Sequence, residues 1–228
     1  MITAVTACMG RLEHLETTLP LMLEAFERVI VVDWSCPQKC GDWAEKEGAQ
    51  VVRKTGERYW NASKARNMGA HQVKTRSVCF IDADVMVTSG LQSEIEGLLD
   101  LSHMVLAPRD SQGYDVHNLN GFIALDIGQF WGVKGYREFL EGYGLEDGYL
   151  RAQLALERGM KARRVSPASL GALRHSHELR NRYAKEILQV SAKRNSALLY
   201  EYLNSQGVID WRKDPRTAEI AYTQEHSQ

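Results

Sequence analysis

The stretch SVCFIDADV, residues 77–85, is the part of the sequence that decides how the rest is interpreted. Its unbroken apolar run is typical of a strand that is buried on both faces. Two aspartates, Asp82 and Asp84, follow the run directly, and residues that alternate around one position can point to the same side. The stretch therefore predicts a buried strand whose carboxyl end presents two carboxylates.

Short apolar runs alternate with helix-like segments around this stretch. We expect strands at Ile2–Cys8, Arg28–Asp33, Gln50–Arg53 and Ser77–Ile81. Between them we expect helices at Glu13–Phe26, Cys40–Gly48 and Ala62–Lys74, the first kinked or restarted at Pro20. This order predicts a parallel sheet with helices on both faces, in which ligands bind beyond the carboxyl ends of the strands. That rule selects three stretches: Cys8–Arg11, Asp33–Ser35 and Asp82–Asp84.

The second half of the sequence is more mixed and is punctuated by glycines. We expect strands or extended segments at Met104–Ala107, Phe122–Leu125, Lys161–Ser166 and Ala172–His177. Helices are expected from about Glu146 to Arg158 and from about Glu178 to Asn204. The sequence shows no internal repeat and no low-complexity linker. It therefore predicts one α/β domain, with residues 1–110 as one half and residues 111–228 as the other.

Composition excludes several classes of protein. The 228 residues are 44% hydrophobic and 25% charged, with a formal net charge of −1, which disfavours a globally basic nucleic-acid binder. No apolar run approaches the ~20 residues that span a bilayer, and the first residues lack the pattern of a signal peptide. The four cysteines do not suggest a disulfide framework, and we expect Cys8 and Cys79 in the core. These features predict a cytoplasmic protein with no membrane span.

Asp82 and Asp84 are candidates for a metal site. Two carboxylates at one strand end can converge on a hard cation such as Mg²⁺ or Mn²⁺, which would neutralise the departing diphosphate of a nucleotide. The alternative is a turn in which an aspartate caps the next helix. Further along the chain, His175 and His177 lie two residues apart on an extended segment, and either could complete the shell begun by Asp84. Histidines of this kind are also often structural or merely exposed.

Three other residues are candidates for nucleotide binding. Asp33 ends the second expected strand, where a carboxylate can accept hydrogen bonds from a base imide or from ribose hydroxyls; the alternative is a turn residue. Arg66, within WNASKARNMGA at residues 60–70, could reach a nucleotide or fix the loop of the two aspartates, but a solvated helix face would carry it as well. Arg11 belongs to the first of the three selected stretches.

Glu146 and Asp147 are the catalytic candidates. They follow a glycine-containing loop, within GYGLED at residues 142–147, and stand at an expected helix start. The helix dipole stabilises anions there, which predicts a low pKa for Asp147. An ionised carboxylate in a sugar site could deprotonate an attacking hydroxyl. The alternative is that one of the two acids simply caps the helix.

Taken in order, these strings resemble the GT-A glycosyltransferases. CMGRLEHLETTLP (residues 8–20), VIVVDWSCP (29–37), WNASKARNMGA (60–70) and FIDADV (80–85) resemble the donor half of family 2-type enzymes. NGFIALDIGQFWGVKGYREFLEGYGLEDGYL (120–150) resembles the C-terminal region of β-1,4-galactosyltransferases, and RHSHE (174–178) is similar to their metal-histidine segment. The resemblance implies a GT-A, Rossmann-like fold, with a mostly parallel sheet flanked by helices and a C-terminal helical acceptor subregion.

The resemblance also implies an activity, that of an inverting hexosyltransferase with a UDP-sugar donor and a Mn²⁺ or Mg²⁺ cofactor. Residues 1–110 would form the nucleotide-sugar-binding half and residues 111–228 the acceptor and catalytic half. By position, the resemblance implies that Asp33 contacts uridine and that Asp82 contacts the ribose or lies behind the metal ligands. It implies that Asp84 ligates the metal, together with His175 or the extra candidate His177. Asp147 would be the general base, Glu146 would bind a sugar, and Tyr143 would be a stacking platform. The sequence departs from the pattern at Leu145, where a glycine is common.

The acceptor is the point on which the alternatives differ. The leading expectation is a carbohydrate or another hydroxyl compound. A modified nucleic-acid base is the second, because residues 161–194 hold nine basic residues against Glu178 and Glu186. Within that stretch we expect Arg180 and Arg182 to contact the acceptor. A third alternative is a non-catalytic nucleotide-sugar-binding module, and a nucleotidyltransferase would normally show a better glycine-rich loop than Cys8–Arg11.

Overall fold

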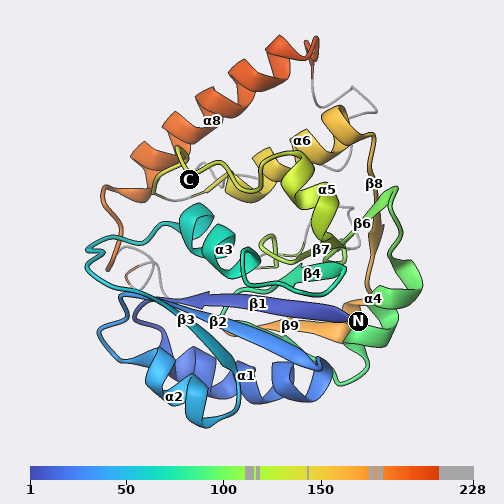
Figure 1. Cartoon of the computed structure of the whole chain (residues 1–228). Helices are drawn as coiled ribbons and strands as arrows, with labels where there is room; N and C mark the ends of the chain where they lie inside the picture. Colours follow the sequence, from blue (N-terminus) through green and yellow to red (C-terminus); the bar gives the residue numbers. More distant parts are fainter. Residues whose placement is uncertain (111–115, 117–118, 143, 175–177, 179–181, 211–228) are drawn as a thin grey trace.

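The computed structural model describes residues 1–110, 116, 119–142, 144–174, 178 and 182–210 (Figure 1). Seven strands form one sheet in the order β3-β2-β1-β4-β7-β6-β8. Their bounds are β1 Ile2–Cys8, β2 Arg28–Trp34, β3 Gln50–Lys54, β4 Ser77–Phe80, β6 His103–Leu106, β7 Ile123–Asp126 and β8 Lys161–Arg164. Strand β7 is antiparallel to both of its neighbours, and the other pairs are parallel. The predicted mostly parallel sheet is confirmed.

Helices cover both faces of this sheet (Figure 1). On one face lie α1 (Leu12–Ala25), α2 (Cys40–Lys46) and α4 (Leu91–Leu98). On the other face lie α3 (Ala62–Ala70), α5 (Ile127–Gly132) and α6 (Glu146–Arg158), and α8 (Leu188–Ser205) packs on the outside of α6. Among the helices that the structure describes, none is both long enough and apolar enough to cross a lipid bilayer.

The central strands are apolar throughout because each of their two faces contacts a different helical layer. In β2, Val29 and Val31 pack with α1 and α2, whereas Ile30 and Val32 pack with α3. Side chains alternate across a strand, so an unbroken run fills both cores at once. Cys8 and Cys79 are buried in the core, as predicted.

Two strands from distant parts of the sequence form a second, smaller sheet. Strand β5 (Val85–Val87) pairs antiparallel with β9 (Leu170–Ala172), which follows the short 3₁₀ helix Pro167–Ser169. The second half of the chain also supplies β8, which pairs with β6 at the edge of the main sheet. Strands from residues 1–110 and from residues 111–228 are therefore hydrogen-bonded to each other in both sheets.

Several expected boundaries were wrong. Helix α1 continues through Pro20 without a break, and residues 182–187 are not helical, so the last helix begins at Leu188 instead of near Glu178. The extended segment expected at Ala172–His177 starts earlier, at Leu170, and its residues 175–177 lie outside the described part of the chain. The expectations did not include β5, α4 or α5, which are too short to show a clear hydrophobic period.

Candidate active site

Arg66 is the buried centre of an ionic cluster beyond the carboxyl end of β4. The residue is only 6% exposed, although it carries a guanidinium. Its Nη2 donates to Asp82 Oδ1 at 2.6 Å, and its Nη1 donates to Glu146 Oε1 and to Asp147 Oδ1, each at 3.1 Å. Three carboxylates that the sequence analysis singled out are thus brought together by one arginine. We call Arg66, Asp82, Glu146 and Asp147 the Arg66 cluster.

The close approach of α3 to the sheet places Arg66 in this position. A Cβ at Gly69 would lie 2.5 Å from Val5 Cγ1 and 2.9 Å from Val32 Cγ2, so only a glycine lets the helix pack this tightly. The helix begins where the Asn61 side chain accepts the Lys64 N–H at 2.9 Å. Arg66 therefore starts from a fixed backbone, and the alternative of a solvated helix face is wrong.

The backbone at Gly121 lies directly against the Arg66 cluster. A Cβ there would lie 2.2 Å from Asp82 Oδ2 and 2.8 Å from Arg66 Nη2. Any larger residue at this position would push apart Arg66 and Asp82, the ion pair that joins α3 to the loop after β4. The approach of a backbone segment this close to a charged pair is a common use of glycine.

Glu146 and Asp147 do not cap the helix that they begin. The cap position of α6 is Leu145, which has a left-handed φ of 69° and makes no side-chain cap hydrogen bond. Both acids point instead to Arg66. A left-handed backbone at a non-glycine residue costs ~1–2 kcal/mol. This strain lies at Leu145, the position where the pattern that the sequence resembles commonly has a glycine.

Tyr136 joins the cluster, and the sequence analysis did not identify it. Its hydroxyl donates to Asp147 Oδ1 at 3.3 Å, and the Arg66 guanidinium lies 5.1 Å from the centre of its ring. The backbone of Tyr136 forms two hydrogen bonds with the Asn67 side chain, at 2.9 and 3.0 Å. Asn67 follows Arg66 in the quoted helix string, but nothing in the sequence indicated which loop it would hold.

Burial raises the pKa of Asp147 to about 7. The Arg66 charge opposes this rise, and the charges of Glu146 and Asp82 add to it. The low pKa expected from the helix dipole was therefore wrong, because removal from water outweighs a partial charge at the helix start. A carboxylate that titrates near neutral pH is a stronger base than an ordinary aspartate.

Asp84, a candidate metal ligand, is buried. It is 3% exposed, and its Oδ2 lies 3.1 Å from Arg11 Nη1. The loop that carries it is held by Thr18 Oγ1, which donates to the carbonyl of Ala83 at 2.8 Å. The N–H of Leu173 donates to the Asp84 carbonyl at 2.8 Å, so the segment that leads to residue 175 passes beside Asp84. His175 and His177 themselves lie outside the described residues.

Asp33 is engaged by the backbone that follows it. Its Oδ1 accepts the Cys36 N–H at 2.8 Å, and its Oδ2 accepts the Gly41 N–H at 3.1 Å. These bonds are what the turn alternative predicts. A contact between Asp33 and uridine stays a prediction.

The acceptor candidates are only partly described. Tyr143 and Arg180 lie outside the described residues, and Arg182 is exposed. In the described part of the basic stretch, Arg163 is paired with Asp100 at 3.1 Å, Lys185 with Glu141 at 2.7 Å, and Arg194 with Glu186. Internal partners thus reduce the charge available for phosphates, and the nucleic-acid alternative gains no support.

No family model matches the chain, and no curated protein matches it in sequence. Solved structures do match its fold. The mannosyltransferase PcManGT from Pyrobaculum calidifontis, solved with GDP-Man and Mn²⁺, has a TM-score of 0.65 at 14% identity over 96% of this chain and 67% of its own. S. aureus TarS residues 1–349 with UDP-GlcNAc has a TM-score of 0.62 at 13% identity, covering 93% and 74%. GalNAc-T7 with UDP, GalNAc and Mn²⁺ has a TM-score of 0.64 at 15% identity, covering 88% and 47%.

These similarities establish the fold. The chain has the mixed α/β architecture of GT-A glycosyltransferases, as the sequence resemblance implied. The likeness of its C-terminal region to β-1,4-galactosyltransferases stays a prediction.

Proposed function

We propose that this chain is a metal-dependent, inverting glycosyltransferase that moves a hexosyl group from a UDP-sugar to a hydroxyl acceptor. The observation that carries the proposal is the Arg66 cluster. Three carboxylates converge on one buried arginine beyond the carboxyl ends of the strands, where α/β sheets bind ligands. Solved structures of the same fold hold UDP or a GDP- or UDP-sugar, two of them with Mn²⁺.

Asp147 is the proposed general base. Within the described part of the chain, the hydrogen bonds of its side chain all go to Oδ1, from Arg66 and from Tyr136. Oδ2 is then the oxygen that takes the proton of the acceptor hydroxyl. The acceptor oxygen forms a bond to the anomeric carbon from the face opposite the diphosphate, the carbon–phosphate oxygen bond breaks, and UDP leaves. Arg66 and Tyr136 are positioning residues in this scheme.

Asp84 is the proposed protein ligand of the divalent cation, with His175 or His177. Its buried carboxylate is the hard oxygen donor that Mg²⁺ and Mn²⁺ prefer. The Arg11 guanidinium lies 3.1 Å from Asp84 Oδ2, and this positive charge beside the carboxylate supports the proposal of a cation there. When bound, the cation would supply counter-charge to the departing diphosphate. Asp33, Arg11 and Asp82 are the proposed contacts of the nucleotide.

A donor-hydrolysis and transfer screen tests the proposal. UDP-sugars are compared with GDP-, CMP- and TDP-sugars in the presence of Mn²⁺, and the anomeric configuration of any product is read by NMR. We expect UDP release from one sugar and an inverted product. Retention of configuration would overturn the mechanism, and UDP binding without hydrolysis or transfer would support the binding-module alternative. Asp42→Asn, on the exposed surface of α2, serves as the matched control for Asp147→Asn.

A further inference from the structure

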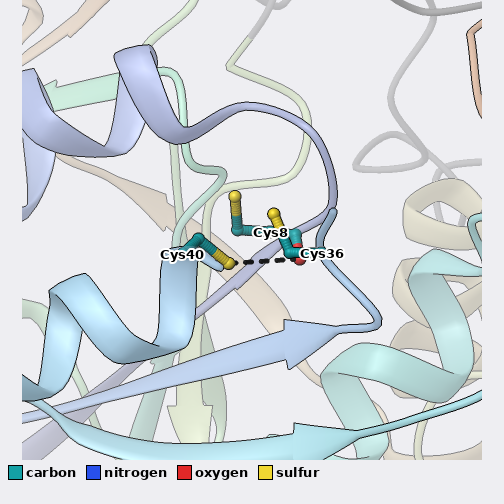
Figure 2. Close-up of side chains that lie close together, drawn as sticks. All are labelled: Cys8, Cys36 and Cys40. Carbon is teal, nitrogen blue, oxygen red and sulfur yellow. Dashed lines mark hydrogen bonds between the residues drawn. The ribbon is translucent and has the colours of Figure 1, made fainter. Parts of the chain in front are cut away.

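Three of the four cysteines gather at one point of the fold (Figure 2). Cys8 ends β1, Cys36 lies in the loop after β2, and Cys40 begins α2. Their sulfur atoms all lie within 4.8 Å of one another, and all three residues are buried. The fourth cysteine, Cys79 in β4, is not part of this group. We call Cys8, Cys36 and Cys40 the cysteine cluster.

Backbone N–H groups are directed at the sulfurs of this cluster. The N–H of Gly10 donates to Cys36 Sγ at 3.2 Å, and Gly10 has the left-handed φ of 68° that this direction requires. The backbone at Cys40 also lowers the pKa of the Cys36 thiol, and the backbone at Arg11 lowers the pKa of the Cys8 thiol. Donors of this kind stabilise negative charge on sulfur, and they are a regular feature around metal-bound thiolates.

The thiols also act on one another. Hydrogen bonds from Cys40 and Cys8 lower the pKa of the Cys36 thiol, and the same contacts with Cys36 raise the pKa of the Cys8 and Cys40 thiols. The three sulfurs are thus close enough to interact with one another. A cation at the centre would be bound by deprotonated sulfurs, so its binding would release thiol protons.

We propose that Cys8, Cys36 and Cys40 form a binding site for a soft, thiolate-preferring metal ion, represented by Zn²⁺. Thiolate ligands select Zn²⁺ and similar soft ions over Mg²⁺ and Mn²⁺. With Zn–S bonds of about 2.3 Å, the sulfurs of a tetrahedral site lie about 3.8 Å apart, so these sulfurs need to close by no more than about 1 Å. The fourth position is filled by water.

Coordination here would join the loops after β1 and β2. The Cys8–Arg11 loop carries Arg11, whose side chain reaches Asp84, and the loop after β2 carries the groups that bind Asp33. The ion would hold both loops through sulfur. Neither Asp84 nor Asp147 is a ligand, so the inference does not depend on the proposed transferase activity.

Cobalt spectroscopy of the whole, reduced chain tests this site. Co²⁺ replaces Zn²⁺ in thiolate sites and gives a sulfur-to-metal charge-transfer band that carboxylate and imidazole sites do not give. The titration is run with excess Mg²⁺ to fill hard oxygen sites and with a reductant that does not bind metals. We expect saturation at one Co²⁺ per chain, displacement of the band by Zn²⁺, and loss of the band in Cys36→Ala.

Cys79→Ala is the matched control, because it also removes a buried sulfur but leaves the cluster whole. Zn²⁺ should raise the Tm of the wild type, since an ion that binds the folded state stabilises it. Cys79→Ala should keep both the band and this rise in Tm. If Cys36→Ala fails to fold, the band and the Tm shift in wild type and in Cys79→Ala decide the matter. The proposal would be overturned if the band were absent in the reduced wild type, survived in Cys36→Ala or were lost in a folded Cys79→Ala. Formation of a disulfide within the cluster in place of Zn²⁺ binding would also overturn it.

Discussion

At the scale of single residues, the surroundings of Asp147 disfavour its charge. Removal from water and the nearby carboxylates of Glu146 and Asp82 outweigh the positive charges of Arg66 and Arg151. Asp147→Asn keeps the hydrogen bonds at Oδ1 but removes the charge and the base. We expect kcat to fall by about 10²- to 10⁴-fold with donor affinity preserved. We also expect Tm to rise above about pH 7, because the ionised form of Asp147, which the folded state disfavours, is then lost. Steady-state kinetics and a thermal melt measure both. Unchanged kcat would transfer the role of base to Glu146.

The pH dependence of the activity follows from the same residue. A base must be ionised, so kcat/KM, which reports the free enzyme, should rise with pH through about 7, where Asp147 loses its proton. The negative charge of Glu146 raises the pKa of Asp147, so Glu146→Gln should move this rise to lower pH. A pH–rate profile of both proteins checks the shift; a midpoint that moves to higher pH would contradict the assignment.

Stability should change with pH in the opposite direction. The folded protein holds the Asp147 proton up to about pH 7, whereas an unfolded chain loses it near the ordinary aspartate pKa of about 3.9. Between these values the folded state binds more protons, so the contribution of Asp147 to the free energy of unfolding falls as pH rises. This fall should be absent in Asp147→Asn.

Asp84 tests the proposed metal site at the level of one ligand. Asp84→Asn keeps the size of the side chain but removes a charged oxygen donor and the partner of Arg11. We expect metal-dependent turnover to be lost and the circular dichroism spectrum to be unchanged. Turnover by this variant in the presence of EDTA at the wild-type rate would overturn the assignment.

At the scale of elements, helix α3 is positioned by the missing side chain at Gly69. Gly69→Ala places a Cβ against Val5, which should destabilise the fold by ~1–3 kcal/mol, less the ~1 kcal/mol gained in helix propensity. The displaced helix should also move Arg66 and lower kcat. Val5→Ala should restore part of both, which a double-mutant cycle measures.

Gly97→Ala in α4 is the matched control for this substitution, because a Cβ there meets nothing within 4 Å. It should stabilise the protein by up to ~1 kcal/mol and leave kcat unchanged. If Gly69→Ala behaved in the same way, tight packing of α3 would not be what places Arg66.

The sequence was sufficient to predict elements whose pattern is local. The apolar runs of β1, β2 and β4 and the full length of α6 were predicted closely, because burial on both faces or on one helix stripe leaves a periodic pattern. Strand β5, with three residues, leaves no such pattern. The late start of α8 was missed because the residue types at 182–187 are compatible with a helix. The non-helical conformation of this segment depends on tertiary contacts such as the ion pair of Lys185 with Glu141.

The candidate site could likewise be predicted from the sequence only in part. The residue types and their order indicated Asp82, Glu146, Asp147 and Arg66, but not that one arginine would hold the three acids. Tyr136 carries no motif, and its role depends on packing between Asn67 and the aromatic rings of Phe80 and Phe130. The pKa of Asp147 was predicted with the wrong sign of shift, since burial is a property of the folded chain and outweighed the helix dipole.

At the scale of the whole molecule, charge on the surface bears on the acceptor. Arg180 and Arg182 belong to the basic stretch, and we expect Arg180→Ala with Arg182→Ala to raise the acceptor KM and leave UDP affinity nearly unchanged. If the acceptor is a polyanion, affinity should also fall steeply with salt. Titrations at several salt concentrations measure this, and a flat response would remove the nucleic-acid alternative.

The pairing of β5 with β9 bears on how the protein is made. A ribosome releases Val85–Val87 long before Leu170–Ala172, and at ordinary synthesis rates the delay is on the order of ten seconds. During that time β5 and the outer edge of β6 have no partner strand, and unpaired strand edges attract other chains. Chaperones that bind nascent chains should therefore raise the yield of folded protein, because they cover these edges until their partner strands are made.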